Sequence, residues 1–164
     1  MAKDTFSFDV VSQVSMPEVA NAVDQARREI SQRFDFKNTG TTIDQDDKLI
    51  ELRSSTEDRL KAALEVLKEK AVRREIPLKA FAYGPVQPAA RGTFRQSVNV
   101  NVGISEDKAK EIVKYLKGTH IKVQSQVQGD QVRVSGKKKD DLQAAIQALK
   151  EHDFDIPLQF VNYR

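Results

Sequence analysis

An internal repeat constrains the fold of this 164-residue chain more than any other feature of its sequence. Residues 56–69, TEDRLKAALEVLKE, align with residues 138–151, KKDDLQAAIQALKE, so that apolar positions and the closing Lys-Glu pair coincide. Shortly afterwards, Ile-Pro-Leu followed by a tyrosine recurs at residues 76–83 and again at 156–163. One similar amphipathic helix would be weak support for duplication, because such patterns are common. The same second motif after both helices indicates a duplicated unit.

The first half predicts the order strand, helix, two strands, helix, strand. Val19, Val23, Ala26 and Ile30 recur at the spacing of one helix face. Proline suits the first turn of a helix, and serine or threonine suits the position before it. The expected elements are a strand at 6–11, a helix at Pro17 capped by Ser15, a turn at 44–47, a strand at 49–52, a helix capped by Ser55 or Thr56 and a strand at 78–83.

The second half predicts the same order. Valines at 98, 100 and 102 alternate with asparagines, which is typical of a strand that is wet on one face. Gly129-Asp130 is expected as the tight turn of a β-hairpin over residues 121–135. The other expected elements are a helix that starts at Ser105 and ends at Gly118, a helix carrying Leu142, Ile146 and Leu149, and a strand at 158–163.

This order is that of the ferredoxin-like (βαββαβ) fold, in which two helices cover one face of an antiparallel sheet. The sequence therefore predicts the α+β class, with two ferredoxin-like domains in tandem. Residues 84–92, GPVQPAARG, contain two prolines and two glycines and are expected to connect the repeats.

Composition narrows the class of protein. The chain is 39% hydrophobic and 31% charged, which is ordinary for a soluble globular protein. Its 27 basic and 24 acidic side chains are finely mixed, so an anionic partner is allowed but not required. Without cysteine, disulfides and thiolate metal sites are excluded. Because we find no signal peptide and no membrane-length apolar run, we expect a cytoplasmic protein without a membrane partner.

No catalytic residue, metal ligand or cofactor is predicted. The glycines are scattered at turns and form no phosphate-binding loop. His120 and His152 have no ligand-spaced His, Cys or Asp, so we interpret them as solvated or helix-terminal side chains. No pair of carboxylates is marked by an apolar pocket that would separate two pKa values. We therefore expect a binding protein rather than an enzyme.

The first candidate binding segment lies where the first helix ends. There Phe34 and Phe36 alternate with Arg33 and Lys37 around a predicted turn. Arginine can stack on a purine or donate to guanine O6 and N7, and lysine can neutralise a phosphate. The alternative is that both phenylalanines belong to the core while the cations lie in water.

The second candidate segment precedes the last helix and comprises Arg133 with Lys137, Lys138 and Lys139. Backbone N–H groups at a helix N-terminus can bind phosphate, and lysines would add charge. The aspartates at 140–141 would compete for those donors, so a solvated turn is the alternative.

The third candidate is the open face of the second sheet. Alternation is expected to bury Val123 and Val127 and to expose polar side chains beside Arg133. The corresponding face of the first sheet would hold Arg95 and Asn99. The set on the second sheet lacks the aromatic rings with which RNA-recognition sheets stack bases. The polar residues expected on the second sheet are Lys122, Gln124, Gln126 and Gln128.

Several blocks resemble the YajQ family of bacterial nucleotide-binding proteins: SFDVVSQV, EVANAVDQARREISQRFDFKN, KVQSQVQGDQVRVSGKKKDDLQAAI and PLQFVNYR. The resemblance covers essentially the whole chain. It implies a cytosolic nucleotide-binding protein, with cyclic di-GMP as the ligand proposed for some members and nucleic acid discussed for others. It also implies that the first strands are exchanged, so that one domain is 14–92 plus the strand 93–103 and the other is 1–13 plus 104–164.

Three hypotheses follow for the function. The first is a non-enzymatic regulator that binds cyclic di-GMP or another purine nucleotide. The second is an RNA- or tRNA-binding protein that uses the polar sheet faces, and the third is a scaffold for a partner such as a transcription regulator. The candidate nucleotide-binding residues are Arg33, Phe36, Lys37, Lys122, Gln124, Arg133, Lys137 and Lys138.

Overall fold

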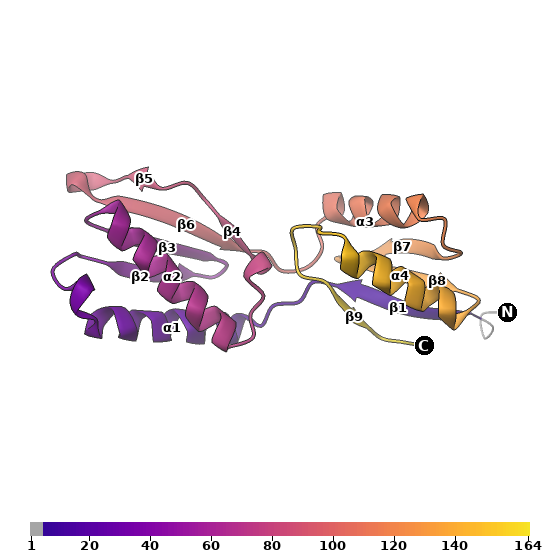
Figure 1. Ribbon diagram of the computed structural model, residues 1–164. Coiled ribbons are helices and arrows are strands. Elements are labelled where there is room, and N and C mark those ends of the chain that lie inside the picture. The colour runs from indigo at the N-terminus through magenta and orange to yellow at the C-terminus, as the bar shows by residue number, and fades with distance from the viewer. Residues whose placement is uncertain (1–4) are drawn as a thin grey trace. The chain divides into compact units, whose positions relative to one another are not determined.

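The computed structural model describes residues 5–164, which form four α-helices and two antiparallel sheets (Figure 1). By its contacts the chain divides into a central unit, residues 14–101, and a terminal unit, residues 5–13 with 102–164. The predicted α+β class with antiparallel sheets is confirmed. Over the described residues, no helix combines the length and the apolar character needed to cross a membrane.

Side-chain caps mark the starts of three of the four helices described. The side chains of Ser15, Thr56 and Ser105 each accept a hydrogen bond from a backbone N–H in the first turn that follows. Thr56, rather than Ser55, is therefore the cap of the second helix. The helices are α1 (Met16–Gln32), α2 (Glu57–Arg73), α3 (Glu106–Gly118) and α4 (Lys139–Glu151).

The predicted end of α3 at Gly118 is confirmed, although the glycine does not supply the left-handed turn. Gly118 is the last helical residue, whereas the left-handed position that turns the chain away belongs to His120, with φ of 59°. Histidine is one of the few residue types besides glycine that are enriched there.

The central unit is a sheet with α1 and α2 on one face. Its strands run in the order β2-β3-β6-β4, and β5 also pairs with β6. Buried aliphatic side chains from both helices and the sheet, such as Val23, Leu52 and Leu60, form its core. The strands are β2 (Thr42–Asp46), β3 (Leu49–Ser54), β4 (Phe81–Tyr83), β5 (Gln87–Pro88) and β6 (Phe94–Val100).

The terminal unit has the same plan, with α3 and α4 packed on its sheet. The strand order is β7-β8-β1-β9, so the indigo β1 lies between the orange β8 and the yellow β9 (Figure 1). Phe8 of β1 is opposite Val134 of β8, and both are fully buried in the core. The strands are β1 (Phe6–Val11), β7 (Gln124–Gln128), β8 (Gln131–Gly136) and β9 (Gln159–Val161).

Several strand ends differ from the sequence prediction because strand pairing decides them. The polar stretch 44–47 is not a turn, since β2 continues to Asp46 and only Asp47 and Lys48 separate it from β3. Asp47 has φ of 53°, as a two-residue hairpin turn requires. The predicted strand 78–83 begins as a 3-10 turn, Leu78–Ala80.

The predicted connector 84–92 is in part a strand. β5 pairs with β6. Proline is tolerated in β5 because this is a short edge strand, where a missing backbone N–H costs little. The Gly84 N–H donates to the carbonyl of Ser97 at 2.8 Å, and an added Cβ would lie 3.0 Å from that oxygen. The buried Gln96 amide donates to the carbonyl of Gly84 at 2.8 Å. This segment is therefore held against the sheet of the central unit.

The polar alternation around β7 is confirmed only in part. Gln124 and Gln126 are exposed as predicted, whereas Gln128, also expected to be exposed, is half-buried. Val123 is half-buried, and β7 begins at residue 124 rather than 121. Val127 was expected to be buried and is instead 43% exposed. Val127 pairs with the buried Val132, but it belongs to β7, which lies at the edge of the sheet.

The segment after β6 is held by the terminal unit. The Gly103 N–H donates to the carbonyl of Ser12 at 2.7 Å. Gly103 has φ of 82°, and an added Cβ would lie 2.7 Å from a carboxylate oxygen of Asp130. The sequence-based division assigned residues 102–103 to the first domain, but their contacts are with the terminal unit.

Candidate functional site

Four of the predicted binding residues line one pocket of the terminal unit, which we call the lysine pocket. Its volume is about 590 Å³, within the usual range for small-molecule sites. The ends of β7 and β8 and the first turn of α4 form its walls. Its lining residues are Thr5, Lys122, Val123, Gln124, Ser135, Gly136, Lys137, Lys138 and Asp141.

The β7–β8 hairpin brings these residues together. Gln124 near the start of β7 is opposite Ser135 near the end of β8, so Lys122 and Lys137 flank the same end of the hairpin. An added Cβ at Gly136 would lie 3.2 Å from the carbonyl oxygen of Lys122. Glycine therefore allows the two segments to approach as closely as they do.

The cations of the lysine pocket have no carboxylate partner among the residues that the structure describes. Lys122, Lys137 and Lys138 are all exposed, and none forms an ion pair with any residue in the range 5–164. Lys138 is also the N-cap of α4, and its side chain makes no capping hydrogen bond. Asp141 is the lone carboxylate among the lining residues described, and it would oppose an anion on its side of the pocket.

Arg133, another predicted binding residue, lies elsewhere and is already paired. Its Nε donates to Oδ1 of Asp9 at 2.9 Å, which joins β8 to β1. Asn162 donates to the other carboxylate oxygen of Asp9 at 2.8 Å. Asp9 is 1% exposed, so this guanidinium compensates a buried charge and is not free for an external phosphate.

The same pair makes the stability of the terminal unit pH-dependent. The hydrogen bond from Arg133 holds the pKa of Asp9 below its usual value, with a further contribution from Asn162, although burial opposes them. A lowered folded-state pKa contributes stability that is complete above the unfolded pKa of about 3.9 and is lost as pH falls through the folded pKa.

We expect the melting temperature of wild type to fall more steeply below about pH 4 than that of Asp9→Asn. Asp46→Asn, which removes an exposed carboxylate, should keep the wild-type profile.

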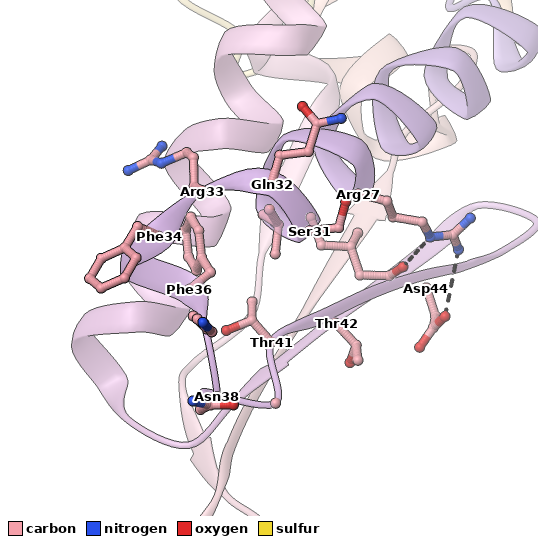
Figure 2. Close-up of a pocket in the computed structure, with 14 residues that line it drawn as sticks. Arg27, Ser31, Gln32, Arg33, Phe34, Phe36, Asn38, Thr41, Thr42 and Asp44 are labelled. Atoms are coloured by element: carbon pink, nitrogen blue, oxygen red, sulfur yellow. Dashed lines mark hydrogen bonds and ion pairs between the residues drawn. The ribbon is translucent and has the colours of Figure 1, made fainter.

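The remaining predicted residues line a second hollow, the turn pocket, in the central unit (Figure 2). It has a volume of about 810 Å³ and lies between the end of α1, the following 3-10 turn Phe34–Phe36 and β2. Apolar, charged and neutral polar side chains all line it, and five of them carry a hydroxyl or an amide. Those labelled in Figure 2 are Ser31, Gln32, Asn38, Thr41 and Thr42.

The two phenylalanines of the turn have opposite environments. Phe36 is 4% exposed, and the guanidinium carbons of Arg33 and Arg59 lie 4.9 and 5.8 Å from its ring centroid. Phe34 is 86% exposed and points outward in Figure 2. Phe36, which the sequence analysis selected, is thus a core residue, and Phe34 is the ring that a base could stack on. No sequence pattern distinguishes two aromatic residues two positions apart in such a turn.

The arginines of the turn pocket are largely committed to internal partners. Arg33 donates to both carboxylate oxygens of Asp35, at 3.0 and 2.8 Å, and to Glu29 at 3.2 Å. Arg27 donates to the carbonyl of Ile43 and lies 3.5 Å from Asp44. Lys37, in contrast, has no ion pair among the residues that the structure describes. Cationic groups are therefore less available here than in the lysine pocket.

Comparison with known proteins is consistent with a nucleotide-binding role. The family model described as nucleotide-binding protein YajQ-like matches residues 6–164. Proteins named nucleotide-binding protein from Desulfitobacterium hafniense (strain DSM 10664 / DCB-2) and Carboxydothermus hydrogenoformans are 54% identical over 164 residues and 51% over 166, each alignment covering 100% of both chains. A relative of the same name from Heliobacterium modesticaldum is 51% identical over 164 residues, covering 100% of this chain and 99% of its own. The resemblance noted in the sequence is thereby confirmed, and the chain belongs to the YajQ-like nucleotide-binding family.

Proposed function

We propose that this protein is a non-enzymatic nucleotide-binding protein that holds the phosphate groups of its ligand in the lysine pocket. The observation that carries the proposal is the convergence of Lys122, Lys137 and Lys138, without ion-pair partners among residues 5–164, on a pocket of about 590 Å³. Unneutralised cations in a concave site attract phosphate without first having to break an internal salt bridge. The hydroxyl of Ser135 and the amide of Gln124 add hydrogen-bonding groups to the same wall.

Cyclic di-GMP is the ligand that we propose first, with a regulatory role. It carries two phosphates and two purine bases, which suits several lysines around one pocket. The proposal includes two tandem ferredoxin-like domains with exchanged first strands, supported by the position of β1 between β8 and β9 and of β6 between β3 and β4. The chain passes from β1 directly into the central unit. A ligand that favours one conformation at the start of β1 therefore shifts the conformational equilibrium of the chain.

Calorimetry with cyclic di-GMP, GTP and ATP tests this proposal directly. We expect measurable heat for at least one of them at tens of micromolar and competition by inorganic pyrophosphate for the same site. The absence of heat from all three would remove the nucleotide-binding proposal.

Replacing Asp141 by asparagine should strengthen nucleotide binding. The substitution removes the carboxylate of the lysine pocket, whose repulsion of an anion at an exposed site is worth about 0.2–1 kcal/mol, or up to about fivefold in affinity. Asp107→Asn, in the first turn of α3 and outside the pocket, is the matched control and should leave the dissociation constant unchanged. Equal affinity of both variants and wild type would place the anion elsewhere.

RNA binding is a second candidate function, favoured by the exposed ring of Phe34, which lines the turn pocket together with Lys37. Stacking of one base on such a ring is worth about 1–3 kcal/mol, so Phe34→Ala should weaken binding of a single-stranded RNA about tenfold. Phe34→Tyr should retain it, and affinity should fall steeply with salt. Unchanged RNA binding by Phe34→Ala would exclude this surface, and binding only to a protein regulator would favour a scaffold.

A further inference from the structure

A smaller hollow beside the lysine pocket is not used by the proposal above. It has a volume of about 290 Å³ and lies between the first turn of α4 and the last residues of the chain. The two hollows are lined by consecutive residues, Thr5 with Phe6 and Lys138 with Lys139. We call the smaller one the C-terminal groove. A molecule in the lysine pocket would thus have the C-terminal groove as its neighbour.

Aromatic rings dominate one side of the C-terminal groove. Tyr163 is 60% exposed and has its ring centroid 6.2 Å from that of the buried Phe8. Phe6 is half-buried, and the Lys139 ammonium lies 5.2 Å from its ring centroid. An exposed tyrosine ring that leans on a buried aromatic is a ready surface for stacking another planar group.

The backbone fixes this surface in place. The N–H of Ser7 donates to the carbonyl of Arg164 at 3.2 Å, and the N–H of Arg164 donates back to Ser7 at 3.0 Å. Tyr163 is therefore followed by a residue, Arg164, whose backbone is hydrogen-bonded to β1. A stacking ring next to a residue whose backbone is held in this way loses less conformational freedom when a ligand binds.

Size and chemistry limit what the groove can accept. Its volume is slightly below the range of about 300–1,000 Å³ typical of pockets that enclose a whole small molecule, so it suits one planar part of a larger ligand. Gln143 and Arg164 also line it, and their forked donors are those that hydrogen-bond the edges of adenine and guanine. Lys139 adds a further positive charge on the side nearest the lysine pocket.

We propose that the C-terminal groove binds the purine base of a nucleotide whose phosphate groups lie in the lysine pocket. The inference rests on the proposed function and specifies the ligand further. One continuous site then recognises both ends of a nucleotide, with the lysines selecting the anion and Tyr163 selecting the flat base. Nucleotides bind there more tightly than phosphate alone, and purines more tightly than pyrimidines because their rings overlap the tyrosine more extensively.

Competition binding with GDP, UDP and inorganic pyrophosphate tests the base subsite. In wild type we expect GDP to bind about tenfold more tightly than pyrophosphate, with UDP between them. Tyr163→Ala should reduce GDP affinity about tenfold, to that of pyrophosphate, and leave pyrophosphate affinity unchanged. Tyr163→Phe should bind GDP like wild type. Tyr83→Ala, at a tyrosine of the central unit that is 41% exposed, is the matched control and should behave like wild type.

A fluorescent variant keeps the test informative if Tyr163→Ala is unstable. The sequence contains no tryptophan, so Tyr163→Trp introduces a unique emitter. GDP should quench it by stacking, and pyrophosphate should not. Equal affinity for GDP and pyrophosphate in wild type, or quenching by neither ligand, would overturn the base subsite.

Failure of the base subsite can be distinguished experimentally from failure of the phosphate site. If pyrophosphate still binds and the loss of the pocket lysines weakens its binding, the proposed function is supported and only the base subsite is wrong. If the lysine substitutions leave pyrophosphate binding unchanged, the phosphate site itself is overturned.

Discussion

Replacing Phe8 by alanine is expected to lower the free energy of unfolding of the terminal unit by about 3–5 kcal/mol. Phe8 is fully buried, and it contributes to a core shared with Val134 of β8 and Ile146 of α4. Truncation removes a large apolar side chain and leaves a cavity that the closely packed surroundings can fill only in part. The effect is a substantial fraction of the stability of an ordinary domain, about 5–15 kcal/mol.

The location of the loss is as informative as its size. β1 is hydrogen-bonded to β8 and β9, so hydrogen exchange of Phe8→Ala should accelerate mainly in residues 102–164. Phe34→Ala is the matched control, because the same substitution at a ring that is 86% exposed should change stability by less than about 0.5 kcal/mol. If exchange instead accelerated mainly within residues 14–101, the pairing of β1 in the terminal sheet, and with it the proposed strand exchange, would be wrong.

The helices could be predicted from the sequence because short-range chemistry determines them. Ser15 and Ser105 are three residues before the N–H groups that they cap, so the signal and the structure lie within one turn. The strand ends could not be predicted equally well. β2 extends through the polar residue Asp46 because β3 pairs with it, and local composition carries no information about a pairing partner.

In the candidate site, too, some features could be predicted from the sequence and others could not. The hairpin at Gly129-Asp130 was predicted, and its pairing of Gln124 with Ser135 already implies that Lys122 and Lys137 lie at one end. The convergence of the lysines could therefore be predicted from the sequence, although Lys122 and Lys137 belong to two separate candidate sites there. The commitment of Arg133 to Asp9 was not available, because it depends on a long-range pairing between β1 and β8.

The position of β1 within the terminal sheet likewise exceeds what periodicity can predict. Residues 6–11 read as a strand in either arrangement, because alternation reports the two faces of a strand and not its neighbours. In the sequence, only the family resemblance suggested exchange. The register of Phe8 with Val134 and of Val10 with Phe160 is the observation that makes the Phe8→Ala experiment decisive.

Removing all three lysines that line the lysine pocket should nearly abolish nucleotide binding. We expect Lys122→Ala, Lys137→Ala and Lys138→Ala combined to raise the dissociation constant by about a hundredfold or more. A hydrogen bond to a charged group contributes about 1.5–3 kcal/mol when fully formed, so loss of two such contacts already accounts for that change. Titration calorimetry or equilibrium dialysis over a range of salt concentrations measures both the loss and a reduced salt dependence.

Net charge alone must be separated from the geometry of the pocket. The matched control replaces Lys110, Lys114 and Lys117, exposed residues of α3, and removes the same number of charges away from the pocket. Equal weakening by both triple variants would mean that the ligand senses only the overall field of the protein. Because Lys122, Lys137 and Lys138 are exposed and make no ion pair within residues 5–164, their loss should leave the melting temperature nearly unchanged. Weakened binding in a fully folded variant can then be attributed to the lysine pocket itself.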